Sequence, residues 1–421
     1  MESPATDLER LVEQLTDALD DRLGEVDADL ARHYPGGRPG RQPVHTVYVP
    51  ADRFRADLAT TYGAAALRTT EEHEAVLLSL LDGDVDLLGL VRDKLAREPV
   101  ENVRIDLEDG YGTRPDDEED ADAARAADEL AAALSAGTAP AWCGIRFKSF
   151  EAPTRRRGIR TLSVFLERLL AGTGLPDGFV VTLPKVTAVE QVEALVHASG
   201  RLEPALGLAA GALRFEIQVE TPQSILGPDG TALVARMVHA SEGRCTGLHY
   251  GTYDYSAYCG IAAAQQSLDH PVADHAKAIM QAAAAGTGVR LSDGSTNVLP
   301  VGDADQVEAA WANHLRLVRR SLERGYYQGW DLHPAQLPTR FAATFAFHRD
   351  GWTAAAARLR TYVERRDSGV LDEPATARAL ADFLLRGIDC GALGADEVAD
   401  ATGLDTRAVM ALAHRAAGQA G

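Results

Sequence analysis

The sequence predicts a (β/α)8 barrel of the TIM type, an α/β fold, with a helix before it and a helical extension after it. Its 421 residues suit one large barrel with additions. Short apolar runs alternate about eight times with longer stretches of helical spacing, which is typical of parallel strands joined by crossover helices. Neither a G-x-G-x-x-G loop nor a G-x-x-x-x-G-K-[ST] loop is present, so a Rossmann or P-loop sheet is disfavoured.

The expected strands are four to eight residues long, and most are rich in β-branched or aromatic residues. They cover residues 45–50, 102–107, 142–147, 178–184, 213–220, 246–250, 289–292 and 326–332. The helical stretches between them cover residues 118–136, 160–172, 187–199, 230–241, 270–286 and 304–324. The longer connection 51–101 is expected to hold two further helices.

Both flanks of the expected barrel are helical in pattern. Residues 6–33 carry apolar residues at helical spacing, with Thr6 or Asp7 as a candidate N-cap, and a Gly- and Pro-rich loop follows. The Ala-rich tail ends in a helix–turn–helix rhythm, which we interpret as a packing or lid element because the chain is acidic. We therefore predict an N-terminal helical segment (1–43), a catalytic barrel domain (44–350), and a C-terminal helical segment for a lid or for oligomerisation (351–421).

The charge of the chain restricts its partners. A formal net charge of -20 repels nucleic-acid phosphates and anionic membranes, so we expect a small-molecule substrate, no nucleic acid and no membrane. The N-terminus resembles no secretory signal, and no apolar stretch approaches the ~20 residues of a membrane span, so a cytoplasmic location is expected. The four cysteines are scattered without a C-x-x-C pair, which disfavours a disulfide framework or a zinc site.

Polar residues gather where the expected strands end, which is where active sites of TIM barrels lie. Glu220 ends the fifth strand and Asp254 follows the sixth, so their carboxylates can converge. Two carboxylates completed by water and substrate oxygens suit Mg²⁺ or Mn²⁺ better than zinc. The alternative is that both are solvated loop residues. Arg146, on the third strand, has an alternative role as the ion-pair partner of Asp106.

Seven motifs occur in order along residues 45–345. They are YVPADRF (48–54), DLEDG (106–110), IRFKS (145–149), LPKV (183–186), QVET (218–221), GTYDYS (251–256) and DLHPAQ (331–336). With them the chain resembles the superfamily of the citrate lyase β-subunit and the HpcH/HpaI aldolases. The resemblance implies that Glu220 and Asp254 bind Mg²⁺ or Mn²⁺, and that Arg146 contacts the substrate carboxylate and an enolate oxygen.

The resemblance also implies further site residues. Glu108, Asp109 and Lys185 are expected in catalytic roles beside Arg146, the two carboxylates by supporting water or the metal. The general base stays open between Glu108, Asp109 and a metal-bound water. Substrate-binding positions besides Arg146 are expected at Arg53, Thr221 and His333.

Together these residues predict a metal-dependent carbon–carbon lyase or aldolase, which acts on a small oxo- or hydroxy-acid through an enolate. The substrate is a free acid or a coenzyme A thioester. The resemblance also implies a homo-oligomer, a trimer or hexamer. The alternatives are a malate-synthase-like acyl-CoA condensing enzyme or thioesterase, suggested by Tyr255 in GTYDYS, and a non-catalytic binding barrel. After the first strand the sequence differs from the pattern of this superfamily, so the use of coenzyme A as acyl carrier stays open. The arginines of 155–160 are candidates to receive an anionic substrate group.

Overall fold

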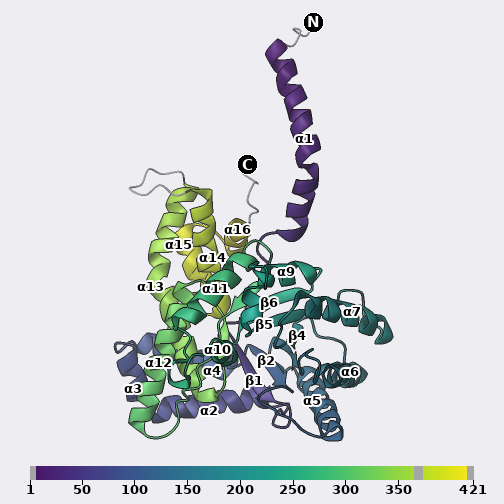
Figure 1. Ribbon diagram of the computed structural model, residues 1–421. Helices are drawn as coiled ribbons and strands as arrows, with labels where there is room; N and C mark the ends of the chain where they lie inside the picture. The colour runs from purple at the N-terminus through teal and green to yellow at the C-terminus, as the bar shows by residue number, and fades with distance from the viewer. Residues whose placement is uncertain (1–5, 365–372, 415–421) are drawn as a thin grey trace.

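The structure, a computed structural model, describes residues 6–364 and 373–414. Parts of the expected terminal segments 1–43 and 351–421, namely residues 1–5, 365–372 and 415–421, lie outside the described residues. Figure 1 shows a central sheet surrounded by helices, with the C-terminal helices stacked on one side of the barrel.

A barrel of eight parallel strands forms within the described part of the chain, as the sequence predicts. The strands are β1 (His45–Pro50), β2 (Asn102–Asp106), β3 (Trp142–Arg146), β4 (Phe179–Leu183), β5 (Phe215–Val219), β6 (Cys245–Tyr250), β7 (Arg290–Ser292) and β8 (Gly329–Asp331). Their order in the sheet is β7-β6-β5-β4-β3-β2-β1-β8. A parallel bridge between Ser292 and Gln328 links the two edges, so the barrel is nearly closed.

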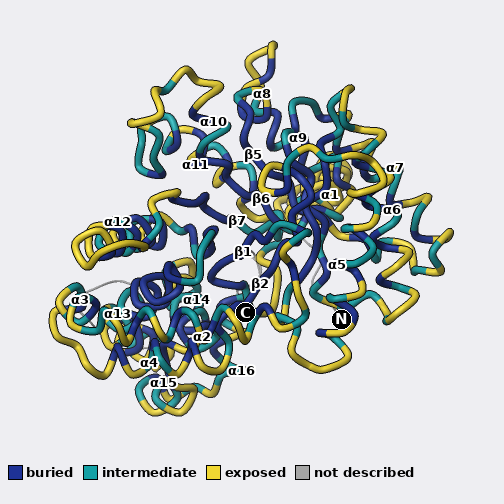
Figure 2. Tube along the Cα trace, turned by 90° about the horizontal axis from the view of Figure 1, so that it is seen from below, coloured by how far each residue is buried: buried dark blue, intermediate teal, exposed yellow. Residues whose placement is uncertain are grey.

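Helices connect the strands and cover the outside of the barrel. They are α5 (Asp116–Ala136), α6 (Arg155–Gly172), α7 (Val189–Ala205), α8 (Pro222–Ile225), α9 (Leu233–Ala240), α10 (Thr252–Tyr258), α11 (Pro271–Ala284) and α12 (Ala304–Glu323), with short 3-10 turns at Ala263–Gln265 and Pro334–Gln336. The outward faces of the strands pack on these helices through buried Val, Ile and Leu side chains. Figure 2 shows the strands buried at the centre and exposed residues along the outer helices.

The connection 51–101, which is described in full, holds three helices where the sequence pattern predicts two. They are α2 (Leu58–Glu72), α3 (Glu74–Leu80) and α4 (Val85–Arg97). The prediction was wrong because only His73, which has non-helical backbone angles, separates α2 from α3. A single interrupting residue hardly disturbs the apolar spacing, so the two helices read as one in the sequence.

The interior of the barrel contains a network of buried polar side chains. Nε and Nη2 of Arg104 donate to the two carboxylate oxygens of Glu216, each at 2.8 Å. His249 Nε2 lies 2.9 Å from the same carboxylate, and His249 Nδ1 accepts from Trp330 Nε1 at 3.0 Å. These buried charges are therefore paired and hydrogen-bonded, which compensates for the loss of water around them.

The C-terminal segment continues directly from the barrel, because α13 (Leu337–Val363) is one unbroken helix. Its second half forms a separate apolar cluster with α14 (Pro374–Cys390), α15 (Ala395–Thr402) and α16 (Thr406–Ala413). Helices α15 and α16 are joined by a turn that begins at Gly403 in the left-handed conformation. The helix–turn–helix pattern of the tail thus forms α15 and α16, which pack against α13 and α14.

The N-terminal helix α1 (Asp7–His33) extends away from the rest of the molecule (Figure 1). It begins at a capping box formed by Thr6 and Glu9, as the sequence predicts for its start. Within this helix no described residue is buried. Among the described residues, no helix combines the length and apolar character needed to cross a membrane.

Candidate active site

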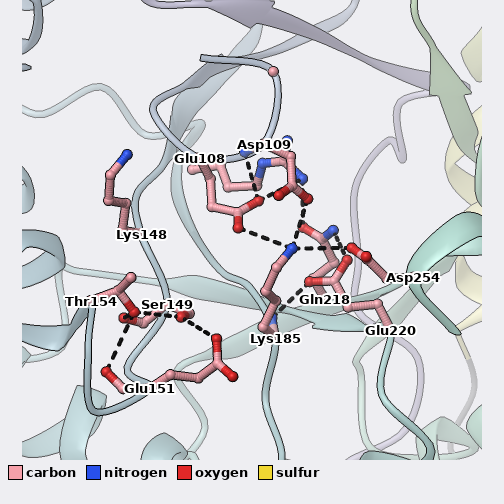
Figure 3. A network of polar contacts seen from close by, with 12 residues as sticks. Glu108, Asp109, Lys148, Ser149, Glu151, Thr154, Lys185, Gln218, Glu220 and Asp254 are labelled. Atoms are coloured by element: carbon pink, nitrogen blue, oxygen red, sulfur yellow. Dashed lines mark hydrogen bonds and ion pairs between the residues drawn. The ribbon is translucent and has the colours of Figure 1, made fainter. Parts of the chain in front are cut away.

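Three carboxylates converge at the carboxyl end of the barrel strands. Glu220 follows β5, Asp254 lies in the first turn of α10 after β6, and Asp109 lies in the loop after β2. One oxygen from each lies within 4.8 Å of the others, and these three residues are here called the carboxylate cluster. Glu220 is buried, Asp254 is half-buried and Asp109 is exposed, so the cluster opens to solvent on one side (Figure 3).

Lys185 lies against the cluster and contacts it through both its main chain and its side chain. Its Nζ lies 2.7 Å from Oδ2 of Asp109, 3.1 Å from Oδ2 of Asp254 and 3.0 Å from Oε1 of Glu108 (Figure 3). Its backbone has a φ of 51°, in the left-handed region that a residue other than glycine rarely adopts. This conformation is an observed backbone outlier beside a site of dense charge, where such strain is commonly found.

The loop that carries Glu108 and Asp109 is held from below and from the side. Asp106 accepts from the N–H groups of Glu108, at 3.0 Å, and Gly110, at 2.8 Å. Lys148 Nζ donates to the carbonyl oxygens of Leu107 and Gly112, both at 2.9 Å. The DLEDG motif therefore forms a fixed loop whose acidic side chains are presented to the cluster.

A glycine permits the close packing behind Glu220. A Cβ atom added at Gly251 would collide with the Cβ of Glu220 and lie 2.8 Å from its Oε2. Gly251 directly precedes α10, the helix that carries Asp254. The glycine of GTYDYS thus lets the two metal-binding candidates approach each other.

Burial and crowding shift the acidity of the site. Burial, reinforced by the charges of Asp254 and Glu108, raises the pKa of Glu220 to about 8. Burial also raises the pKa of Glu108 to about 7, and the neighbouring Asp109 adds to this rise. Burial opposes ionisation of Asp109 too, but its contacts with Glu108 and Lys185 outweigh that effect and lower its pKa. Carboxylates that repel one another in this way fit a divalent cation with oxygen ligands, such as Mg²⁺ or Mn²⁺.

Arg146 lies below the cluster, where its guanidinium forms a fork with Asp106. Nε and Nη2 each donate to one carboxylate oxygen at 2.7 Å. The ion pair that the sequence left as an alternative for Arg146 is therefore present in the structure. Nη1 points elsewhere: it donates to Oε1 of Gln218 at 3.2 Å and lies 3.6 Å from Oε2 of Glu108. Gln218 in turn donates to Glu220, which connects Arg146 to the cluster.

Two aromatic rings that the sequence reasoning missed hold the guanidinium of Arg146. Its Cζ lies 4.8 Å from the centre of the Tyr48 ring and 5.9 Å from that of Trp330. The two rings stack on each other with their centres 4.3 Å apart. Both residues lie inside expected strands, and the two-residue alternation of strands could have placed them on the inner face. Only barrel closure brings β8 beside β1, so their meeting was not visible in the sequence.

The other expected substrate-binding residues are not brought into the cluster. The hydroxyl of Thr221 donates to the carbonyl oxygen of Val186 at 2.5 Å and accepts from the N–H of Ser224 as the N-cap of α8. His333 caps the 3-10 turn that follows it by accepting from the N–H of Ala335 at 3.2 Å. Arg53 is exposed, and its side chain forms no hydrogen bond or ion pair with the cluster or with any other described residue.

The arginine run after β3 is partly neutralised by α5. Arg157 and Arg160 both pair with Asp120, and Arg157 also lies 3.3 Å from Glu119. Arg155 and Arg156 are exposed at the start of α6. The run therefore serves in large part to pack α6 on α5.

The comparisons with known proteins give one family and several distant structures. A family model described as "Domain of unknown function (DUF6986)" matches residues 23–417. Among curated proteins, no sequence matches the chain.

Solved structures with a similar arrangement include the protein CitE of Mycobacterium tuberculosis in complex with magnesium, acetoacetate and coenzyme A. The two chains are 18% identical with a TM-score of 0.49, and the match covers 85% of this chain and 98% of CitE. A malate synthase of Haloferax volcanii in a magnesium and glyoxylate complex is 14% identical with a TM-score of 0.48, covering 90% and 100% of the two chains. These proteins are too distant for their activities to be transferred to this chain.

Proposed function

Since the chain belongs to the DUF6986 family, whose description states no function, we propose a function from the site itself. The proposal is a divalent-metal-dependent carbon–carbon lyase or aldolase that acts on a small oxo- or hydroxy-acid. The observation that carries it is the carboxylate cluster at the carboxyl end of the strands, with oxygens within 4.8 Å of one another and Arg146 beneath them. The motif resemblance to the citrate lyase β-subunit and HpcH/HpaI superfamily agrees with this assignment.

In this proposal Glu220 and Asp254 hold Mg²⁺ or Mn²⁺, with Asp109 as a third oxygen donor. When bound, the cation would supply positive charge for the enolate oxygen that forms as the carbon–carbon bond breaks. Nη1 of Arg146 lies outside the fork to Asp106 and donates one hydrogen to Gln218, so its second hydrogen is proposed to reach a substrate oxygen. Tyr48 and Trp330 keep its plane fixed, so that this charge is already oriented before substrate binds.

Glu108 is the proposed proton carrier. Its pKa of about 7 lets it hold or release a proton near neutral pH, as a general acid or base requires. Lys185 Nζ, 3.0 Å from Glu108 and 2.7 Å from Asp109, stabilises the ionised forms of both carboxylates. Thr221 fixes the turn after Glu220 through its contact with Val186, so its proposed contribution to substrate binding is indirect.

The malate-synthase-like alternative gains no support from Tyr255. That side chain is buried and its ring packs on Tyr250, with the ring centres 5.6 Å apart. The non-catalytic alternative leaves the crowding of Glu108, Asp109 and Glu220 around one lysine without a purpose, since such crowding destabilises a fold.

Metal-dependent enolisation tests the proposal. The protein is incubated in deuterated water with Mn²⁺ or Mg²⁺ and either pyruvate or acetyl-CoA, and loss of the methyl signal is followed by proton NMR. Exchange of pyruvate supports a free-acid aldolase, and exchange of acetyl-CoA supports a thioester lyase or condensing enzyme. If neither these nor a panel of related oxo-acids exchanges in the presence of metal, the proposal is wrong.

A further inference from the structure

A cavity lies at the end of the barrel opposite the carboxylate cluster. Its volume is about 470 Å³, and it is bounded by the loop 36–44, the end of α11 with the turn into β7, and helix α14. Arg290, the first residue of β7, lines it, whereas the cluster follows the last residues of β5 and β6. Because the strands are parallel, the two sites face opposite ends of the barrel.

The lining of this cavity is positively charged although the chain as a whole carries -20. Of the described residues, four arginines and two aspartates contribute to it: Arg38, Arg290, Arg378, Arg386, Asp382 and Asp389. Arg386 is neutralised by Asp382, with Nε 2.7 Å from Oδ2. Burial raises the pKa of Asp389, while the charges of Arg41, Arg386 and Arg290 oppose that rise. Among the described residues, the guanidiniums of Arg38, Arg290 and Arg378 form no ion pair with a carboxylate.

Arg290 is one of the arginines that form no ion pair. Its guanidinium donates to the main-chain carbonyl oxygens of Arg41, at 2.6 Å, and Gly40, and it forms no ion pair with a described carboxylate. Burial, together with the charges of Arg38 and Arg386, lowers its pKa to about 10, and the charge of Asp389 opposes this shift. The loop that contains Gly40 is thus tied to a cationic group that forms no ion pair with a carboxylate of the described residues.

The side chains of Arg38 and Arg378 form no hydrogen bond or ion pair within residues 6–364 and 373–414. Nε of Arg378 is buried without an acceptor, which is an unfavourable state for a donor. Arg38 is exposed, and partial burial of its guanidinium together with the charge of Arg214 lowers its pKa. By contrast, Arg41 on the same loop pairs with both Glu98 and Glu101.

We propose that this cavity binds a small, multiply charged anion of the phosphate or carboxylate type, held by the guanidiniums of Arg38, Arg290 and Arg378. The volume falls within the roughly 300–1,000 Å³ of small-molecule sites. Forked guanidiniums are the groups best suited to phosphate and carboxylate oxygens. The anion would contact the N-terminal loop, the barrel and α14 at once, so it links the C-terminal helices to the barrel. Its place at the amino end of the strands separates it from the carboxylate cluster.

Calorimetric titration in metal-free buffer tests this inference on the full chain. Pyrophosphate and citrate are the two probes, and sodium chloride at equal ionic strength is the reference. The test variant is Arg38→Gln with Arg378→Gln, because neither side chain has a partner whose loss would disturb the fold. The matched control is Arg68→Gln with Arg236→Gln, two exposed arginines outside the cavity. Asp254→Asn serves to exclude binding at the carboxylate cluster.

We expect saturable binding of at least one probe to the native chain, the control and Asp254→Asn. The test variant should bind at least about tenfold more weakly, since it loses the charge-assisted hydrogen bonds of two guanidiniums. The preferred probe distinguishes a phosphate ligand from a carboxylate ligand. Binding that Asp254→Asn abolishes, binding that the test variant retains in full, or no saturable binding at millimolar concentrations of either probe would each overturn the inference. None of these results depends on lyase activity.

Discussion

The main-chain N–H of Lys185 donates to Oε1 of Glu220 at 2.7 Å, from a residue whose φ is 51°. The LPKV and QVET motifs therefore meet through the backbone of one and the side chain of the other. This bond orients Glu220 from behind, and the same residue places its ammonium in front of Glu108 and Asp109.

Replacing Glu220 by glutamine should abolish metal-dependent exchange while preserving the fold. The amide has nearly the same shape, but it lacks the charge that a divalent cation requires. We expect exchange to fall by about a hundredfold or more, a loss comparable to removing one electrostatic group from a transition state. Glu190→Gln, an exposed change on α7, is the control and should leave exchange unchanged. Exchange that survives in Glu220→Gln would remove Glu220 from the proposed metal site.

Stabilisation by Mg²⁺ should increase with pH. The pKa of Glu220 is about 8 in the folded chain, above its ordinary value of 4.5. The folded state without metal thus holds this proton more tightly than the unfolded state, so Glu220 lowers stability as pH rises from 4.5 to about 8. A bound cation compensates for the buried negative charge of Glu220.

The measurement is the melting temperature with and without Mg²⁺ across that pH range. The difference should widen toward pH 8 in the native chain and vanish in Glu220→Gln. A difference that is constant with pH would mean that metal binding is not coupled to this proton.

Removing the ammonium of Lys185 should separate metal binding from turnover. In Lys185→Met the cluster loses a cation 2.7 Å from Asp109 and 3.1 Å from Asp254, so its affinity for Mn²⁺ should rise. Exchange should fall nonetheless, because Glu108 and Asp109 are no longer held in their ionised positions. Mn²⁺ affinity is measured by electron paramagnetic resonance and exchange by NMR. A parallel loss of both would indicate that Lys185 only supports the fold.

Gly251→Ala should disturb the site through packing alone. The added methyl group meets Glu220, and overpacking of this kind destabilises by about 1–3 kcal/mol. We expect Mn²⁺ affinity to fall together with the free energy of unfolding in urea. Gly89→Ala is the control: it lies within α4 with no atom within 4 Å of the new Cβ, so it should stabilise by about 0.5–1 kcal/mol. Equal effects of the two changes would contradict the close packing at Glu220.

The exposed apolar face of α1 leads to a prediction about assembly. Its large side chains are 46% to 67% exposed: Leu8, Leu11, Val12, Leu15, Leu19, Leu23, Val26 and Leu30. Most follow a 4-3-4 spacing that repeats after 11 residues, a pattern of helices that associate along one seam. We propose that α1 packs on α1 of other copies to form a homo-oligomer. Pairing along this face would bury apolar side chains that are now about half exposed, which favours association.

Light scattering of the eluting protein checks this assembly. Leu15→Asp with Leu19→Asp should convert the assembly to monomers, whereas Gln14→Asp, on the polar face of α1, should not. An unchanged mass in the Leu variant, or a monomeric native chain, would contradict the proposal.

Sequence periodicity sufficed to predict the eight strands, because each strand has its own pattern of buried residues. Glu220 and Asp254 could be selected as candidates for the same reason: they end local patterns that parallel strands must bring to one end of the barrel. The predicted number of helices between β1 and β2 was wrong, because His73 alone separates α2 from α3 and does not change the apolar spacing.

What the sequence by itself determined was therefore local: the strands, their connections and the polar residues at their ends. Tertiary structure alone decided which atoms meet. It pairs Arg146 with Asp106, places both beneath Glu220 through Gln218, and uses Thr221 and His333 as caps. It also collects unpaired arginines from three distant segments at the opposite end of the barrel. The physical reason is that these contacts depend on barrel closure and on side-chain orientation across strands, and neither leaves a periodic trace in the chain.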